Sequence, residues 1–331
     1  MNTLKSILDT YLADGAVGAS LAYVRGDAEP VALAAGLSDR ATGAPVSTSQ
    51  LFKIGSCTKT FVAAALVKLG ELGRIDLGEP VSRWFPDLPG AEAISVRQLI
   101  NHRNGLPEFE YYIPMDPSRV WKPSELVDIA FNNEKPKAPN GPAVYNNTGY
   151  VLAGMLIEAV TGAPLGAYVR SAVLEPLGLK DTWSPATEPF PAERMVQGYY
   201  HRPPPAAGAS TDLASGGEMW RMDGVLPYSD ELQDSSNCFP YSGAYGCGDM
   251  VSTPSDMVRF MRGLFSGKVL SAPFFAEMFD KRAIVSFPGT RMRETGAGMF
   301  QSSYGGRAFY GHQGSIPGYV TVMQYDPASG I

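Results

Sequence analysis

Residues 56–67 read Ser56-Cys57-Thr58-Lys59-Thr60-Phe61-Val62-Ala63-Ala64-Ala65-Leu66-Val67. The small and apolar residues after Lys59 predict a helix over 56–70 that is hydrophobic nearly all round, so we expect it at the centre of the fold. Ser56 and Lys59 are three residues apart and would share one face of the first turn. There the backbone N–H groups and the positive end of the helix dipole lie beside the serine hydroxyl.

A lysine beside a serine in this position is typical of nucleophilic catalysis. A lysine held out of water can lose its proton and then take the proton of the serine hydroxyl. An isolated S-x-x-K is weak, because roughly one is expected by chance in a chain of this length. Here it is followed in order by Tyr145-Asn146-Asn147 and His312-Gln313-Gly314, and each pattern occurs once. The ordered set predicts Ser56 as the nucleophile.

The second motif offers an alternative base. Either a neutral Lys59 takes the serine proton, or the Tyr145 phenolate, stabilised by Lys59, accepts it and passes it to the leaving group. The amide of Asn147 can donate to Lys59 or to a substrate carbonyl. The residues alone leave the choice of base open.

The third motif is expected where a strand over 307–310 turns into a loop, ahead of a second strand over 319–325. Gly314 lets the backbone approach the serine closely. The N–H groups of Ser56 and Ser315 are therefore our candidates for an oxyanion hole. We count His312 and Gly314 with the catalytic set, and Gln313 with the residues that contact substrate.

Composition narrows the class of protein. The 331 residues are 44% hydrophobic and 18% charged, as in an ordinary globular protein, and the formal net charge of −6 argues against a nucleic-acid surface. The scattered Cys57, Cys238 and Cys247 form neither a disulfide framework nor a zinc spacing, and we expect Cys57 to be a small packing residue. The three histidines are far apart, so we do not expect a metal enzyme.

The N-terminal stretch predicts an amphipathic helix over 1–13 rather than a signal peptide. No apolar run reaches the length of a membrane span. We therefore expect cytoplasmic residence and no membrane partner, and the oligomeric state stays open.

The expected helices and strands divide the chain into two domains. Strands are expected over 17–24 and 30–35, and helices over 94–102, 148–161 and 254–265. We expect a sheet domain made of 1–75 and 241–331, with a mostly helical domain, 76–240, inserted in it. Residues 183–240 are rich in Pro, Gly and aromatic residues, which predicts a long ordered loop over a pocket; the alternative is an insertion with no role.

The motif order resembles the penicillin-recognising serine hydrolases, which include class C β-lactamases, D,D-carboxypeptidases, D-aminopeptidases and related esterases. An H-x-G third motif is similar to the D-aminopeptidase and D-amino-acid amidase branch. The resemblance also includes the stretches Leu51–Phe61, Trp84–Pro89, Leu99–Pro107, Tyr145–Tyr150, Pro176–Trp183 and Gly248–Pro254.

This resemblance implies an α+β fold, in which an antiparallel sheet is flanked by helices and carries an inserted, mostly helical domain. The site would lie between the two domains. It also implies acyl transfer without metal or cofactor. In the family a further strand and a C-terminal helix follow the H-x-G strand, so we expect both to be missing from a sequence that stops at Ile331.

The implied activity is hydrolysis of amides or short peptides of D-amino acids. Such substrates carry an ammonium group that needs an anion, and Glu108 and Glu110 are the candidates, with Glu110 preferred. A buried ion pair there would help only if both ions are well hydrogen-bonded. Exposure of both glutamates to water is the alternative. Asp212, Asp223 and Asp230 in the long loop compete for the role.

Three other functions remain open. A carboxylesterase of the same fold needs less protonation of its leaving group than an amidase does. A β-lactamase or D,D-peptidase would use the same serine, although its substrates are met outside the cytoplasm. A non-catalytic binding module on this scaffold would be marked by degraded motifs, and here all three motifs are intact.

Overall fold

The computed structural model describes residues 2–202, 225–279, 282–283 and 292–331. Its α-helices are α1 (Asn2–Ala13), α2 (Thr58–Glu71), α3 (Val96–Ile100), α4 (Pro123–Asn133), α5 (Thr148–Thr161), α6 (Leu165–Val169), α7 (Pro254–Phe265) and α8 (Ala272–Glu277). Shorter helical turns are η1 (Gly55–Cys57), η2 (Val81–Arg83), η3 (Ala91–Ala93), η4 (Arg170–Leu174), η5 (Glu175–Leu177), η6 (Ala192–Arg194) and η8 (Tyr241–Ala244).

The described strands pair antiparallel in four small sheets, ordered β1-β2-β3, β13-β12-β11-β10-β9, β4-β8-β5 and β6-β7. Their bounds are β1 (Gly18–Tyr23), β2 (Val31–Asp39), β3 (Ala44–Pro45), β4 (Phe52–Lys53), β5 (Thr182–Trp183), β6 (Tyr199–His201), β7 (Leu232–Asp234), β8 (Val251–Ser252), β9 (Arg282–Ala283), β10 (Met292–Thr295), β11 (Phe300–Tyr304), β12 (Arg307–Ile316) and β13 (Tyr319–Tyr325).

Helix α2 lies at the centre of the molecule, as its sequence predicts. Eleven of its residues are buried, and it packs against α5, α6 and α8. Its side chains give the core a continuous apolar path from the helices to the sheets, including a stacked pair of rings, Phe61 and Phe260 of α7, 3.7 Å apart. Cys57 is fully buried, so its expected packing role is confirmed.

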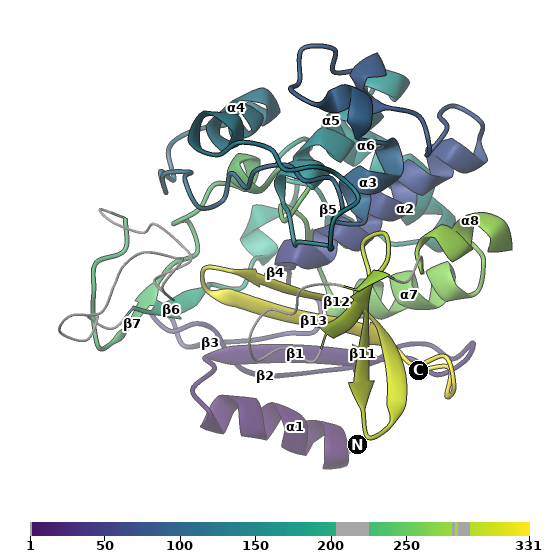
Figure 1. The fold of residues 1–331 in the computed structure, drawn as a ribbon. Coiled ribbons are helices and arrows are strands. Elements are labelled where there is room, and N and C mark those ends of the chain that lie inside the picture. The colour runs from purple at the N-terminus through teal and green to yellow at the C-terminus, as the bar shows by residue number, and fades with distance from the viewer. Residues whose placement is uncertain (1, 203–224, 280–281, 284–291) are drawn as a thin grey trace.

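The molecule is layered around this helix (Figure 1). Helices α3 to α6 form the upper part, β12 and β13 cross the middle, and β1, β2 and α1 lie below. Helix α7 packs against β1 and β13 and so connects the middle layer with the lower one.

Two helices begin and end where local signals predict, and a third does not. Helix α5 spans the predicted residues and is followed by Gly162, which has a φ of 71°, the left-handed conformation that glycine adopts without strain. Helix α7 begins after Thr253, whose side chain accepts a hydrogen bond from the Asp256 N–H. The predicted helix over 94–102 is shorter in the structure, where α3 ends at Ile100.

The predicted position of the third motif is wrong. His312, Gln313 and Gly314 lie inside β12 and pair with Met323, Val322 and Thr321 of β13, rather than where a strand gives way to a loop. The turn comes later, at residues 317–318, because Ile316 pairs with Tyr319 and closes a two-residue hairpin.

The long segment 183–240 is described in part. Its described portions contain the last residue of β5 and all of η6, β6 and β7, and the rest of the predicted loop, residues 203–224, lies outside the described residues. The domain boundaries at 75/76 and 240/241 stay a prediction.

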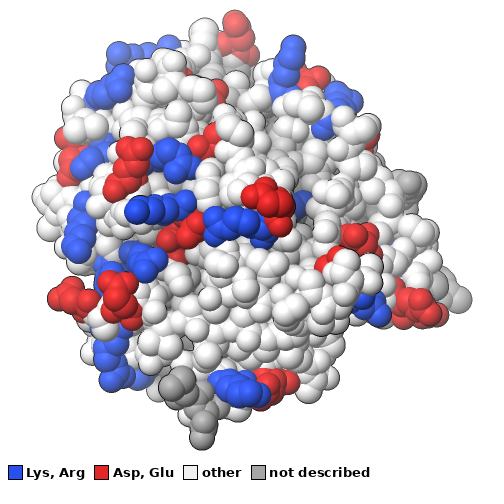
Figure 2. All heavy atoms as spheres, turned by 180° about the vertical axis from the view of Figure 1, so that it is seen from behind, with Lys and Arg blue, Asp and Glu red and all other residues white. Residues whose placement is uncertain are grey.

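Charged side chains are mixed on the face shown in Figure 2, where lysines and arginines alternate with aspartates and glutamates. Within the described ranges, no single helix is long and apolar enough to cross a membrane. Helix α5 and the helical segment 165–177 together have the length and apolar composition of a membrane span, but the chain bends by 77° between them.

Candidate active site

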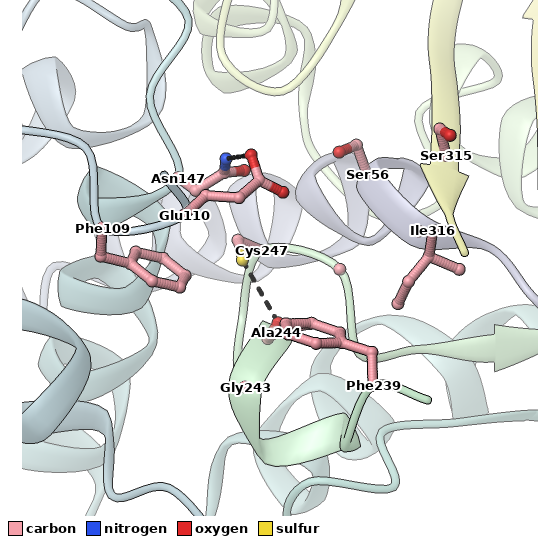
Figure 3. A pocket seen from close by; sticks show the side chains of 12 residues that line it. Ser56, Phe109, Glu110, Asn147, Phe239, Gly243, Ala244, Cys247, Ser315 and Ile316 are labelled. Atoms are coloured by element: carbon pink, nitrogen blue, oxygen red, sulfur yellow. Dashed lines mark hydrogen bonds between the residues drawn. The ribbon is translucent and has the colours of Figure 1, made fainter. Parts of the chain in front are cut away.

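The predicted nucleophile lines a small cavity that is partly open to solvent. Figure 3 shows Ser56 between the Glu110–Asn147 pair on one side and Ser315 of β12 on the other. The cavity is lined by Gly55, Ser56, Phe109, Glu110, Asn147, Phe239, Gly243, Ala244, Cys247, Gly248, Ser315 and Ile316. Segments far apart in the chain therefore meet at one serine.

Ser56 lies in η1, the tight turn that leads into α2. The Lys59 ammonium nitrogen is 3.1 Å from the Ser56 Oγ and donates a second hydrogen bond, at 2.7 Å, to the Cys247 carbonyl. Lys59 is fully buried, so it is held out of water as the sequence analysis expects. The local geometry predicted from the three-residue spacing is thus present.

Tyr145 completes this cluster. Its phenol hydrogen-bonds to the Ser56 hydroxyl, and its ring centroid is 4.8 Å from the Lys59 nitrogen. A second ring, that of Tyr150, is 5.5 Å from the same nitrogen. The lysine is therefore held by one hydroxyl, one carbonyl and two aromatic rings.

Burial shifts the pKa values of this cluster in opposite directions. Loss of water lowers the pKa of Lys59, against the opposing attraction of the two nearby glutamates. The same loss of water raises the pKa of the Tyr145 phenol well above its ordinary value. Both shifts favour the uncharged forms, a neutral amine and a neutral phenol.

The two predicted oxyanion donors lie where η1 and β12 pack backbone to backbone. A Cβ on Gly55 would lie 2.9 Å from the Ser315 nitrogen, and one on Gly314 would lie 3.0 Å from the Ser56 nitrogen. Ser315 pairs with Val320 next to the hydrogen-bonded pair that closes the hairpin. Hydrogen bonding alternates along an antiparallel pair, so the Ser315 N–H is directed away from β13 and toward η1.

His312 is buried behind this contact. Its ring centroid is 4.7 Å from that of Phe300 and 6.1 Å from that of Tyr145, and its Nδ1–H donates a hydrogen bond to the Gln313 carbonyl. Burial, with a smaller effect of the Lys59 charge, lowers the pKa of His312 to about 3. The imidazole is therefore neutral over the ordinary pH range.

The predicted acidic pair is ordered rather than solvated. Glu108 is buried and accepts hydrogen bonds from the backbone N–H groups of Asn147, at 2.6 Å, and Glu110, at 3.0 Å. Glu110 lines the cavity, and its Oε2 accepts a hydrogen bond of 2.7 Å from the Asn147 side chain (Figure 3). The Asn147 amide thus donates its hydrogen bond to Glu110, whereas the sequence suggested Lys59 or a substrate carbonyl as the acceptor.

These carboxyls lose water and repel one another. Burial raises the pKa of Glu110 to about 8, and the Glu108 charge adds to the shift. Burial also raises the pKa of Glu108. An incoming cation would reverse the shift at Glu110, because an opposite charge at hydrogen-bonding distance favours the carboxylate.

The rest of the cavity wall is apolar. Phe109 lies beside Glu110, while Phe239 and Ile316 lie on the Ser315 side (Figure 3). Lys53 holds the Phe239 segment, because its buried ammonium donates to the Ser236 carbonyl at 2.7 Å and to the Phe239 carbonyl at 3.4 Å.

Some predicted residues stand apart from the cavity. Gln313 and Glu108 are not among its lining residues, and Asp230 is exposed at the surface. Asp212 and Asp223 lie outside the described residues. The sequence reasoning missed the apolar wall and the Cys247 carbonyl. Phe109 could have been predicted from its position between the two glutamates, because its side chain is part of the sequence. A backbone carbonyl such as that of Cys247 could not, because every residue type has one.

A serine hydrogen-bonded to a buried lysine and to a tyrosine, at the junction of helices and antiparallel strands, is the arrangement of a β-lactamase-like serine hydrolase site. The model of the family described as Beta-lactamase matches residues 4–331, and the chain belongs to this family. This confirms the predicted family and α+β fold class, and with them the expected enzyme class.

Three relatives illustrate the likeness. D-amino acid amidase from Ochrobactrum anthropi SV3 has a TM-score of 0.92 at 40% identity, over 99% of this chain and 88% of that one. D-stereospecific amidohydrolase from Streptomyces sp. has a TM-score of 0.78 at 28% identity, over 98% and 89%. Esterase EstB from Burkholderia gladioli is 28% identical over 68% of this chain and 61% of its own length. The chain spans about half to three-fifths of several curated relatives, EstB included.

Proposed function

We propose that this chain is a D-stereospecific amidase, which hydrolyses amides or short peptides of D-amino acids through an acyl-enzyme on Ser56. The observation that carries the proposal is the Glu110 carboxylate, which lines the same cavity as Ser56 and is oriented by Asn147. An α-ammonium bound there would place the neighbouring carbonyl at the serine. A substrate whose acyl group carries no positive charge would not form an ion pair with this carboxylate.

Acylation follows from the protonation states of the cluster. Neutral Lys59 takes the Ser56 proton while the serine oxygen bonds to the substrate carbonyl carbon. The N–H groups of Ser56 and Ser315 receive the developing oxyanion. Tyr145 gives its proton to the amine nitrogen as the C–N bond breaks, and the Lys59 ammonium returns a proton to the phenolate. Water then releases the acid by the same steps in reverse.

Stereospecificity follows from three contacts around one carbon. The ammonium would bind Glu110, the carbonyl would bind the oxyanion donors, and an apolar side chain would fill the space beside Phe239 and Ile316. Three fixed contacts accept one enantiomer. Preference for the D form is supported by the 40% identity to a D-amino acid amidase.

Ammonia release from D- and L-phenylalaninamide tests the reaction, with Ser56→Ala as the control. We expect ammonia from the D-amide alone and none from the variant. Folded protein that releases none, but cleaves p-nitrophenyl acetate, would instead support the esterase alternative. Rapid turnover of a cephalosporin would support a β-lactamase. Residence in the cytoplasm stays a prediction from the sequence.

The role of Glu110 is tested with Glu110→Gln, which keeps the shape and removes the charge. We expect kcat/KM for the D-amide to fall about 10- to 100-fold, the cost of one charged hydrogen bond. Hydrolysis of p-nitrophenyl acetate should stay near native. Asp230→Asn is the matched control, because that aspartate is exposed and should leave both activities unchanged. Equal losses on both substrates in Glu110→Gln would contradict ammonium binding.

A further inference from the structure

His102 has an unusual backbone. It lies just after α3 and has a φ of 62°, and among the described non-glycine residues only Asn140 shares a positive φ. A left-handed histidine is strained, so the surrounding contacts have to hold it there. The family-like stretch 99–107 contains this residue, yet none of the proposed catalytic steps uses it.

Two hydrogen bonds attach His102 to the residues on either side of Tyr145. Its backbone carbonyl accepts from the Val144 N–H at 2.9 Å, and its ring Nδ1 accepts from the Asn146 N–H at 3.2 Å. The chain is therefore fixed immediately before and immediately after the tyrosine that meets Ser56. The left-handed conformation matters here, because it lets one residue present both its carbonyl and its ring to a single tripeptide.

The ring of His102 also supports the Tyr145 ring directly. The two centroids are 4.7 Å apart, and Tyr150 lies 5.4 Å away on another side. The ring is 2% exposed, and its Nδ1 is an acceptor, so the proton resides on Nε2. Burial, together with the Lys59 charge, keeps the pKa of His102 well below its ordinary value, so the ring stays neutral.

We propose that His102 is a positioning residue that sets the Tyr145 phenol against Ser56 and Lys59. It touches neither substrate nor the reacting atoms and acts through Tyr145, chiefly through the Nδ1 acceptor. The inference rests on the proposed function, in which Tyr145 protonates the leaving group. A plain core histidine would instead stabilise the fold without favouring any class of substrate.

The test compares leaving groups. An amine leaves only with a proton, whereas p-nitrophenolate leaves without one, so misplacing Tyr145 should impair amide hydrolysis selectively. His102→Gly keeps the positive φ without strain but removes acceptor and ring. His102→Asn tolerates the same φ and places a carbonyl oxygen where Nδ1 was.

For His102→Gly we expect the ratio of D-phenylalaninamide to p-nitrophenyl acetate hydrolysis to fall at least about tenfold. Tyr145→Phe, which removes the proposed proton donor itself, should lower the same ratio. His102→Asn should recover most of that ratio. Both rates come from the same preparation, so partial unfolding cancels. If His102→Gly does not fold, His102→Phe replaces it, since phenylalanine fills the space but cannot accept the hydrogen bond.

Asn104→Ser is the matched control for damage to the same turn. Asn104 is equally buried and hydrogen-bonds within its own loop, and we expect its variant to lower both rates alike. An unchanged ratio in His102→Gly, or no recovery in His102→Asn, would overturn the proposal. If Tyr145→Phe itself left the ratio unchanged, or the native enzyme released no ammonia, the proposed function would be at fault instead.

Discussion

At the scale of single residues, burial decides which groups carry charge. Lys59, Tyr145 and Glu110 are all shifted by loss of water toward their uncharged forms; in the proposed mechanism the first two exchange protons, while Glu110 binds the substrate. The substrate would supply the missing charge. An ammonium group entering the cavity would ionise Glu110, so binding and the protonation state of the site are linked.

The effect of burial on His312 can be tested by measuring how stability changes in acid. Its folded-state pKa of about 3 lies below the ordinary value of 6.5, so the unfolded chain takes up the proton first. The stability it contributes is complete above pH 6.5 and is lost as the pH falls toward 3. Between pH 6.5 and 4 we expect a loss of about 3 kcal/mol from this residue.

Urea unfolding at several pH values measures the effect. His312→Gln removes the titrating ring and should flatten the acid side of the stability curve. His201→Gln is the control, because His201 is exposed at the end of β6. Identical acid sensitivity in the two variants would mean that the buried imidazole does not resist protonation.

At the scale of elements, the contact between η1 and β12 forms the proposed oxyanion site. Neither element contains it alone, since the Ser56 N–H belongs to the turn and the Ser315 N–H to the strand. The strand can come this close only because residue 314 is a glycine, and an added Cβ there would overlap the Ile54 carbonyl oxygen.

Gly314→Ala should therefore separate the two N–H donors. We expect kcat to fall about 100-fold or more, the effect of removing one oxyanion donor, together with a lower melting temperature. Gly141→Ala is the matched control, because the one atom near an added Cβ there is the Ala138 oxygen at 3.8 Å. Near-native activity in Gly314→Ala would show that β12 does not need this close approach.

At the scale of the whole molecule, the site is assembled across layers. The helical part supplies Glu110 and Asn147, the middle strands supply Ser315, and the segment after β7 supplies Phe239. Lys53 of β4 connects the last of these to the central core. It is a buried cation held by two carbonyls, with the Tyr241 ring 4.7 Å away, and burial lowers its pKa to about 8.

Lys53→Met should release the Phe239 wall without touching the catalytic cluster. We expect KM for the D-amide to rise and kcat/KM to fall about tenfold, the value of a charged hydrogen bond, with little change in kcat. Lys68→Met is matched, since Lys68 also bonds a distant carbonyl, that of Val269, away from the cavity. A loss confined to kcat would argue against a role in binding.

Much of the fold follows from the sequence. The bounds of α5 and α7 and the pairing of Ser56 with Lys59 depend on interactions between residues a few positions apart, which a local pattern records. The order of the three motifs was enough to predict the family. Of the candidate site, Ser56, Lys59, Tyr145 and Glu110 were predicted and meet at the cavity or beside it, while Gln313 and Glu108 do not line it.

Tertiary structure decided the rest, because those features depend on contacts between distant segments. Asn147 orients Glu110 across 37 positions, and His312 lies within a strand whose length is set by pairing with β13. His102 fixes Tyr145 through backbone atoms, and backbone acceptors are the same in every residue type. The sequence alone thus predicted the candidate catalytic residues, and the packing of distant segments decided which groups hold them and in which direction their pKa values shift.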